Sequence, residues 1–317
     1  MFTRLLIFGL SLMGVSLCVE GATVIRVTAT TTHVADMVRG VAGDAVEVSG
    51  LMGPGVDPHL YKPTSQDVRK LNNADVVFYS GLLLEGRMAD LLDKARRRGR
   101  RVYAVTDNIP HERLIYPSGK TTYPDPHVWM DAELWITGID VVVTSLSEVD
   151  PANAGLFAER GEALKQDYLA THAWALDRVQ TLPESQRILI TSHDAFNYFG
   201  RAYGFKVVGI QGISTVSEAG LADIANTVDL IQKHQLPAVF VESSVAPAAI
   251  ERVSRDAGVQ IGGQLYSDAL GQPGELLIGP DGTSYDAGTW VGMLKHNVNT
   301  IVAALSNSSS DDSPQTR

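Results

Sequence analysis

The tripeptide Asp-Pro-His occurs twice in this 317-residue chain, at residues 57–59 and 125–127. Proline fixes its own backbone φ near about −65° and so stiffens the approach to the following histidine. A stiff approach reduces the entropy lost when an imidazole is held for a metal ion. The aspartate can also accept the second ring N–H and so select one tautomer. A single Asp-Pro pair is a common turn signal, but two copies in strand-end loops favour a metal site.

Two further side chains occupy comparable positions. Ligands of open α/β sheets bind beyond the carboxyl ends of the strands. His193 ends the strand-like segment RILITSH, and Asp268 follows the strand-like segment VQIGGQLY. His59 follows AVEVSGLM, and His127 lies in the loop after RVYAVT. His59, His127, His193 and Asp268 are therefore the candidate metal ligands, although their wide spacing matches no local metal motif and is weak evidence alone.

The chain has five other histidines, and the position of none of them favours a metal ligand. We expect these residues to lie on helices or in connecting loops, in ordinary structural roles. They are His33, His111, His172, His234 and His296.

Composition excludes some classes of protein. Hydrophobic residues make up 44% of the chain and charged residues 20%, as in folded globular proteins. A net charge of −10 argues against a nucleic-acid partner. The basic run KARRRGRR at 94–101 is expected to be the solvated end of a helix.

The N-terminus predicts export. Arg4 precedes the apolar run LLIFGLSLMGVSL, which is too short to span a bilayer and typical of a signal peptide. We expect residues 1–22 to be a signal segment and the rest to reach the periplasm or the outer face of the cytoplasmic membrane. The signal is cleaved after Gly21 or retained as an anchor, or Cys18 is lipidated. Cys18 is the only cysteine, so no disulfide is possible and the metal ligands must be nitrogen and oxygen.

Strand-like and helix-like segments alternate along the chain, which predicts an α/β fold with parallel sheets covered by helices. We expect two (β/α) lobes, at 23–150 and 183–306, each with a parallel four-stranded sheet. The predicted strands are 23–30, 45–52, 74–81 and 101–106, then 187–193, 205–211, 238–244 and 259–266.

One long helix is predicted to join the lobes over residues 151–182. Asp150 is its expected N-cap and Pro151 suits its first turn. About 30 helical residues span roughly 45 Å, enough to run along both lobes and to limit their relative motion to small tilts. The polar tail at 307–317 is expected to be disordered.

Several segments resemble, in order, the motifs of one family. GPGVDPHLYKPTSQD, DPHVWMD, TSHDAFNYFGRAYGF and YSDALG are similar to motifs of the metal-binding solute-binding proteins of ABC importers, the ZnuA/TroA family (cluster A-I). The resemblance covers residues 23–305. It implies two lobes joined by a rigid helix, and a metal ion held between them by His59, His127, His193 and Asp268, two from each lobe. It also implies a monomer that delivers its metal to an ABC permease.

Three imidazoles and one carboxylate suit Zn²⁺ and also accept Mn²⁺ or Fe²⁺. Manganese-specific members of this family usually have Glu where His193 stands. The zinc-specific branch often has a His-rich loop before the second histidine, but the corresponding stretch HERLIYPSGKTTYP has one histidine. We therefore expect Zn²⁺ and/or Mn²⁺ as the ligand.

Two other functions stay open at this point. A secreted zinc hydrolase would need a general base beside the metal, for which Asp194 or Glu242 is available. A surface adhesin would use the metal only to stabilise its fold, and it should unfold when the metal is removed.

Overall fold

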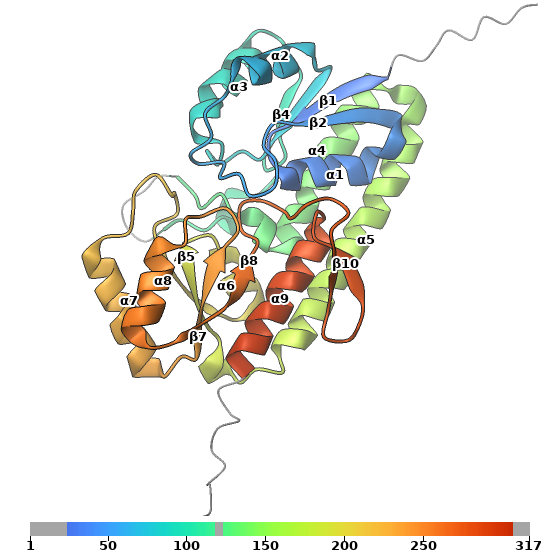
Figure 1. Cartoon of the computed structure of the whole chain (residues 1–317). Coiled ribbons are helices and arrows are strands. Elements are labelled where there is room, and N and C mark those ends of the chain that lie inside the picture. Colours follow the sequence, from blue (N-terminus) through green and yellow to red (C-terminus); the bar gives the residue numbers. More distant parts are fainter. Residues whose placement is uncertain (1–23, 118–122, 307–317) are drawn as a thin grey trace, which may run out of the picture.

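A computed structural model of the chain describes residues 24–117 and 123–306, and it has two lobes joined by a long helix (Figure 1). The predicted signal segment 1–22, with Cys18, and the predicted tail 307–317 lie outside the described residues. Within the described ranges, no helix combines the length and the apolar character needed to cross a membrane.

The first lobe holds a parallel four-stranded sheet, as predicted. The strand order is β2-β1-β3-β4. Its strands are β1 (Ile25–Ala29), β2 (Val46–Gly50), β3 (Val76–Tyr79) and β4 (Val102–Ala104), and its helices are α1 (Thr32–Ala42), α2 (Ser65–Asn73), α3 (Ala89–Arg97) and α4 (Ala132–Val149). Thr64 caps α2, because its hydroxyl accepts the N–H of Asp67 while the Asp67 carboxylate accepts the N–H of Thr64.

The second lobe differs from the prediction of one four-stranded sheet. Parallel hydrogen-bonded ladders join β5 to β6 and β7 to β8, and β5 lies beside β7 without such a ladder. A bulge between Val239 and Phe240 shifts the register of the second pair. The strands are β5 (Ile188–His193), β6 (Lys206–Gln211), β7 (Ala238–Glu242) and β8 (Gln260–Leu265), and the helices are α6 (Asn197–Tyr203), α7 (Leu221–His234), α8 (Ala248–Ala257) and α9 (Trp290–Ser306).

Short elements complete the fold. An antiparallel hairpin, β9 (Leu276–Ile278) with β10 (Ser284–Asp286), lies between β8 and α9 in the chain. The 3₁₀ turns are η1 (Gly43–Ala45), η2 (Gly86–Met88), η3 (His111–Arg113), η4 (Val128–Met130), η5 (Pro151–Asn153) and η6 (Glu184–Gln186).

The linking helix is α5 (Ala154–Val179), whose 26 residues span about 39 Å. The Asp150 carboxylate caps the 3₁₀ turn that leads into it, as predicted. α5 packs against α1 and α4 of the first lobe and against α9 of the second. Gly161 permits the close approach of α4, because a Cβ there would lie 2.6 Å from the Val143 side chain.

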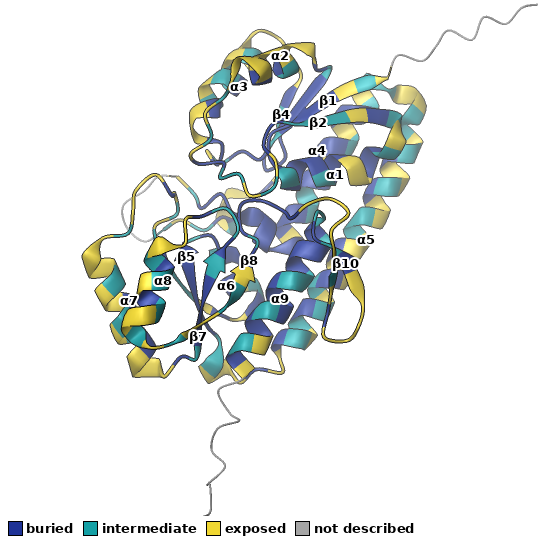
Figure 2. Cartoon of the chain, in the orientation of Figure 1, coloured by how far each residue is buried: buried dark blue, intermediate teal, exposed yellow. Residues whose placement is uncertain are grey.

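The core runs from one lobe into the other (Figure 2). Trp129 and Trp290 are fully buried in it. The Trp290 indole N–H donates to the Trp129 carbonyl at 2.8 Å, and the Trp129 indole N–H donates to the Ser267 carbonyl at 2.9 Å. This chain of contacts holds the loop that carries Asp268 against the first lobe.

Candidate metal centre

The structure brings the four predicted ligands to one point between the lobes. Each offers a nitrogen or oxygen atom, and these four atoms all lie within 4.8 Å of one another. All four side chains are buried, with at most 6% of any residue exposed. His59 and His127 come from loops of the first lobe, His193 is the last residue of β5, and Asp268 follows β8.

The spacing of the donor atoms suits a small cation. His59 Nε2 lies 3.3 Å from His127 Nε2, and His193 Nε2 lies 3.3 Å from Asp268 Oδ2. Asp268 Oδ1 is 3.4 Å from His127 Nε2, and Oδ2 is 3.7 Å from His59 Nε2. Tetrahedral ligands at zinc distances lie about 3.3 Å apart. With Asp268 Oδ2 as the fourth vertex, three of the six edges of such a tetrahedron are therefore within about 0.4 Å of this length.

The second Asp-Pro-His copy has the expected geometry. His127 Nδ1 donates to Asp125 Oδ1 at 2.7 Å, and the backbone N–H of His127 donates to the same oxygen at 3.0 Å. A ring that donates from Nδ1 presents the lone pair of Nε2 to the centre. Asp125 therefore fixes both the position and the tautomer of His127.

The first copy works differently. Asp57 Oδ1 accepts the backbone N–H of His59 at 2.8 Å, and Oδ2 accepts the hydroxyl of Thr215 at 2.5 Å. Thr215 belongs to the second lobe. Asp57 thus holds the loop of His59 and links it to the opposite lobe, instead of binding the ring.

Glu242 is the partner of His193 and the residue whose role the sequence did not reveal. Its carboxylate accepts Nδ1 of His193 at 2.6 Å and the backbone N–H of His193 at 2.8 Å. It ends β7, the strand beside β5. The sequence does show a carboxylate at the end of a strand-like segment. We interpreted that carboxylate as a possible general base and not as the partner of a histidine.

A second contact across the lobes was also missed. Asn197 Nδ2 donates to Asp125 Oδ2 at 3.0 Å, and the Tyr198 hydroxyl donates to the Asp125 carbonyl at 2.9 Å while accepting the N–H of Ile115 at 3.0 Å. These bonds fix Asp125, and through it His127, from both sides of the interface.

The electrostatics of the centre favour a positive charge. Burial lowers the pKa of His127, but Asp125 and Asp268 outweigh it and raise this pKa to about 9. At His193 the carboxylates of Glu242 and Asp268 likewise outweigh burial and hold the pKa well above its usual value. Two protons on these rings carry the same charge as one divalent cation. A divalent ion can therefore replace them without changing the net charge of this buried cluster.

The same balance of burial and neighbouring charges sets the pKa values of the other two candidate ligands, His59 and Asp268. Burial lowers the pKa of His59 to about 4, against the attraction of Asp268, so this ring offers a free lone pair at neutral pH. Burial alone would raise the pKa of Asp268, but His193 and His127 outweigh it and hold this pKa well below its usual value. Asp268 is therefore anionic across the ordinary pH range.

The other five histidines join no metal-binding group of the described residues. Burial lowers the pKa of His33 to about 3, and this ring stacks on Trp129. The rest have ordinary contacts or exposure: His111 with Tyr116, His172 with Tyr203, His296 with the Gln264 carbonyl, and His234 on the surface.

Known proteins share this sequence and fold. Residues 27–304 match the family described as ZnuA, zinc-uptake complex component A periplasmic. The manganese-binding lipoprotein MntA of Bacillus subtilis is 45% identical over 286 residues, which is 89% of this chain and 90% of that protein. The zinc-binding protein TroA of Treponema pallidum is 42% identical over 285 residues, which is 88% of each chain.

The comparison of structures agrees. The solved periplasmic zinc-binding protein TroA of Treponema pallidum superposes with a TM-score of 0.83 at 41% identity, over 89% of this chain and 99% of that one. Both the sequence match and the shared two-lobe architecture cover nearly all the described residues. This chain belongs to the ZnuA family of periplasmic metal-uptake proteins.

Proposed function

We propose that this chain captures one divalent transition-metal ion between its lobes, with His59, His127, His193 and Asp268 as ligands. It then delivers the ion to an ABC-type permease in the cytoplasmic membrane. The metal is cargo, so the centre must release it as well as hold it.

One observation carries this proposal. His193 Nε2 and both carboxylate oxygens of Asp268 are buried and make no hydrogen bond with any described residue, and their close contacts, at 3.3–3.4 Å, lie within the cluster itself. Buried polar atoms are nearly always satisfied. Three unsatisfied atoms from one cluster, beside two more imidazole nitrogens, are the expected arrangement for atoms that bind a cation.

The donor set favours zinc, with manganese as the second candidate. Three nitrogens and one oxygen in a compact buried shell suit Zn²⁺, whereas Mn²⁺ prefers more oxygen ligands. The names of the relatives divide between the two metals. His193 is the ligand that we expect to decide between them.

The relatives named lipoproteins support an extracytoplasmic location. We propose that residues 1–22 direct export and that Cys18 is the lipid-bearing residue when the chain is anchored. The lobes are then 23–150 and 183–306, with 151–182 as the linking helix.

The hydrolase alternative has less support. Glu242 is engaged twice by His193, so it is not a free base beside the metal. Four protein ligands also fill the shell that a catalytic zinc leaves partly open. Both observations therefore argue against a hydrolase.

The test is metal analysis of the chain purified without added metal, followed by competitive Zn²⁺ and Mn²⁺ titrations. We expect one ion per chain, and we expect His193→Glu to shift preference toward Mn²⁺. His111→Glu, on the exposed 3₁₀ turn η3, is the matched control and should leave the preference unchanged. Wild-type protein that binds neither ion above non-specific levels would refute the proposed function.

A further inference from the structure

The basic run at 94–101 is larger than a helix end requires. Six of the 26 basic side chains lie in these eight positions, although the chain carries a net charge of −10. One or two cations satisfy the last carbonyls of a helix. Arg100 does this for α2, since its guanidinium donates to the carbonyls of Asn72 and Ala74. The other basic side chains have no such role.

The run lies at the edge of the first lobe where the chain enters β1. Asp75 donates its backbone N–H to the Arg26 carbonyl, and Val77 donates its own to the Arg101 carbonyl. Because β3 lies between β1 and β4, Arg26 and Arg101 are two strand spacings apart, about 10 Å. Val24, the first described residue, enters at this same edge. The metal centre lies at the opposite, carboxyl ends of the strands.

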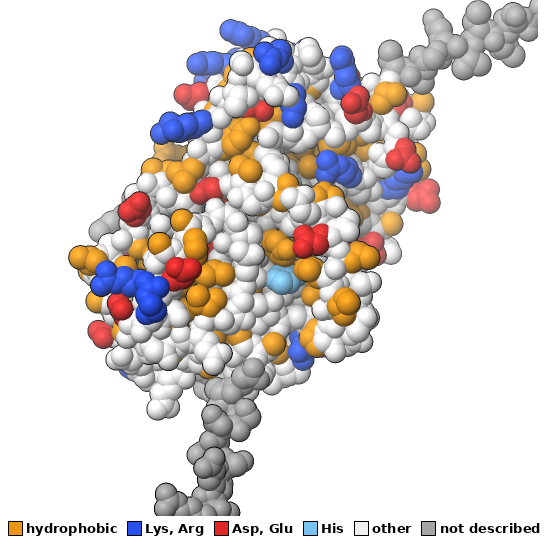
Figure 3. Space-filling model, in the orientation of Figure 1, with side chains coloured by type: hydrophobic (Ala, Val, Ile, Leu, Met, Phe, Trp, Pro, Cys, Tyr) orange, Lys and Arg blue, Asp and Glu red, His pale blue; other side chains and the backbone are white. Residues whose placement is uncertain are grey.

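Several of these side chains are exposed and unengaged. Lys94, Arg98 and Arg101 are exposed, and their side chains make no hydrogen bond or ion pair with any residue in 24–117 or 123–306. Arg97 pairs with Asp93 at 2.7 Å. Figure 3 shows Lys and Arg side chains gathered over the end of the molecule formed by α2 and α3. This end is positive on a protein that is negative as a whole.

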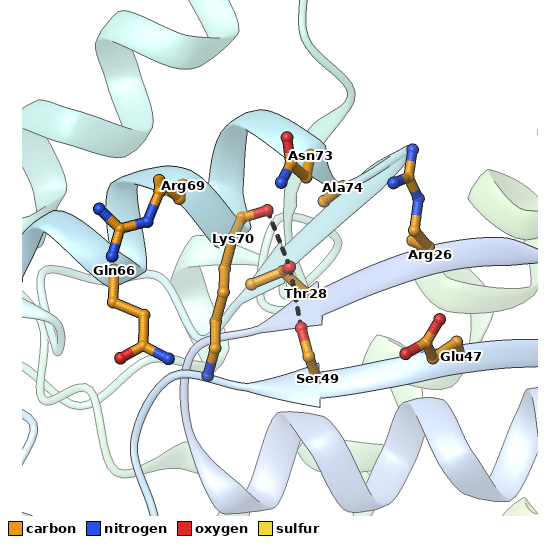
Figure 4. Close-up of a pocket in the computed structure, with 9 residues that line it drawn as sticks. All are labelled: Arg26, Thr28, Glu47, Ser49, Gln66, Arg69, Lys70, Asn73 and Ala74. Atoms are coloured by element: carbon orange, nitrogen blue, oxygen red, sulfur yellow. Dashed lines mark hydrogen bonds between the residues drawn. The ribbon is translucent and has the colours of Figure 1, made fainter.

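A hollow of about 330 Å³ continues this surface between α2 and the strands β1 and β2 (Figure 4). Arg26, Arg69 and Lys70 line it, with Glu47 as the one acidic side chain. Lys70 is engaged with the Gly50 carbonyl at 2.9 Å. The positive surface therefore extends from the end of α3 onto α2.

We infer that this basic edge, defined by Arg26, Arg69, Lys94, Arg98 and Arg101, docks on the surface of an anionic lipid bilayer. The inference rests on the proposed function, which attaches the chain to the membrane near Cys18. Five residues, 19–23, lie between Cys18 and Val24, which limits the distance between their Cα atoms to about 22 Å. The basic edge is thus the part of the folded chain held nearest to the lipid.

Electrostatics favours an anionic lipid surface over a soluble molecule as the partner of the basic edge. Clusters of basic residues next to a membrane attachment bind anionic headgroups. Screening limits each charge to about 8–10 Å at physiological ionic strength, so the acidic remainder of the chain does not cancel a local attraction. Docking through this edge also leaves the rim around the metal centre uncovered, because the edge and the rim lie at opposite ends of β1.

The test uses the chain without residues 1–21 and two kinds of vesicle. One is phosphatidylcholine, and the other contains about three parts in ten of phosphatidylglycerol. Wild-type protein should co-sediment with the anionic vesicles at least about tenfold more strongly, and salt should weaken this binding. The triple variant Lys94→Gln, Arg98→Gln, Arg101→Gln should lose about tenfold. It spares the Arg97–Asp93 pair and the Arg100 cap.

The matched control is Lys206→Gln, Lys233→Gln, Arg255→Gln, three exposed positions of the second lobe that remove the same charge. It should bind vesicles within about twofold of wild type, because its positions lie on the second lobe and not on the basic edge. Equal loss in both variants, equal binding to both vesicles, or tighter binding to a short DNA duplex than to anionic vesicles would each overturn the inference. Metal content is measured on every variant. One ion per chain without vesicle binding rejects the lipid surface alone, whereas missing metal rejects the proposed function.

Discussion

The carboxylate of Glu242 binds His193 twice, at 2.6 Å through ring Nδ1 and at 2.8 Å through the backbone N–H. Both residues are buried, and they end the adjacent strands β7 and β5. This double contact fixes the ring and its tautomer, so that Nε2 faces Asp268. The affinity of the centre should therefore depend on a residue that does not touch the metal.

Glu242→Gln tests this dependence. The amide can accept one of the two N–H groups, but it no longer stabilises the tautomer that presents Nε2. We expect metal affinity to fall by about 10–100-fold. A competition titration against a chelating dye measures the change. Glu218→Gln, at an exposed loop position, is the control, and equal affinities for both variants would contradict the assigned role of Glu242.

Thr215→Val removes the hydroxyl that the second lobe donates to Asp57. Because Asp57 also holds the backbone of His59, we expect the loop of His59 to open more readily. Loss of one such hydrogen bond corresponds to about a fivefold faster release of metal. Stopped-flow transfer of the ion to a chelator measures the rate. Thr215→Ser keeps the hydroxyl and should release metal at the wild-type rate. Fast metal release from Thr215→Ser would contradict the role of this hydrogen bond in holding the loop of His59.

Much of the fold was predictable because its signals are local. Every strand of the parallel ladders begins and ends within a few residues of a β-branched run bounded by turn residues. Thr64 and Asp150 mark the starts of helical segments, because each side chain accepts the backbone N–H of the residue three positions ahead. The four candidate ligands were predictable for a related reason, since parallel strands place their carboxyl ends at one edge.

The rest depends on contacts between distant residues. Asp57 and Asp125 stand in identical tripeptides, yet one binds Thr215 and the other binds a ring nitrogen. Glu242 becomes the partner of His193 only because β7 packs beside β5. The same packing leaves the second lobe with two ladders instead of one sheet. No local pattern encodes which strands become neighbours, so none of these roles could be predicted.

Trp290→Ala tests the core that joins the lobes. Trp290 is fully buried, its ring lies 4.2 Å from that of Tyr168, and its indole N–H donates to Trp129. Removing it leaves a large cavity and an unpaired carbonyl, so the free energy of unfolding should fall by about 3–5 kcal/mol. Urea unfolding of chelated protein measures this. Trp174→Ala, at a half-buried position of α5, should lower the free energy of unfolding clearly less. A comparable decrease in both variants would contradict the assigned role of Trp290 in joining the lobes.

Asp36→Asn tests a buried carboxyl away from the metal centre. Asp36 accepts the N–H of Trp290 at 2.8 Å and the hydroxyl of Tyr168 at 3.5 Å, and burial raises its pKa from 3.8 to about 6. The folded protein thus binds this proton more tightly than the unfolded chain does. The resulting stabilisation is complete below pH 3.8 and is lost as the pH rises through about 6. Chelated wild-type protein should therefore lose stability relative to Asp36→Asn over this window, by on the order of 1–3 kcal/mol.

Unfolding free energies measured across that window, for both proteins without metal, isolate this one group because every other titration is shared. Asp44→Asn, at an exposed position of η1, should follow the wild-type profile throughout. Parallel profiles for wild type and Asp36→Asn would mean that the carboxyl stays ionised in the fold. Its hydrogen bonds to Trp290 and Tyr168 would then balance its burial, so that its pKa would be the same in the folded and unfolded chain.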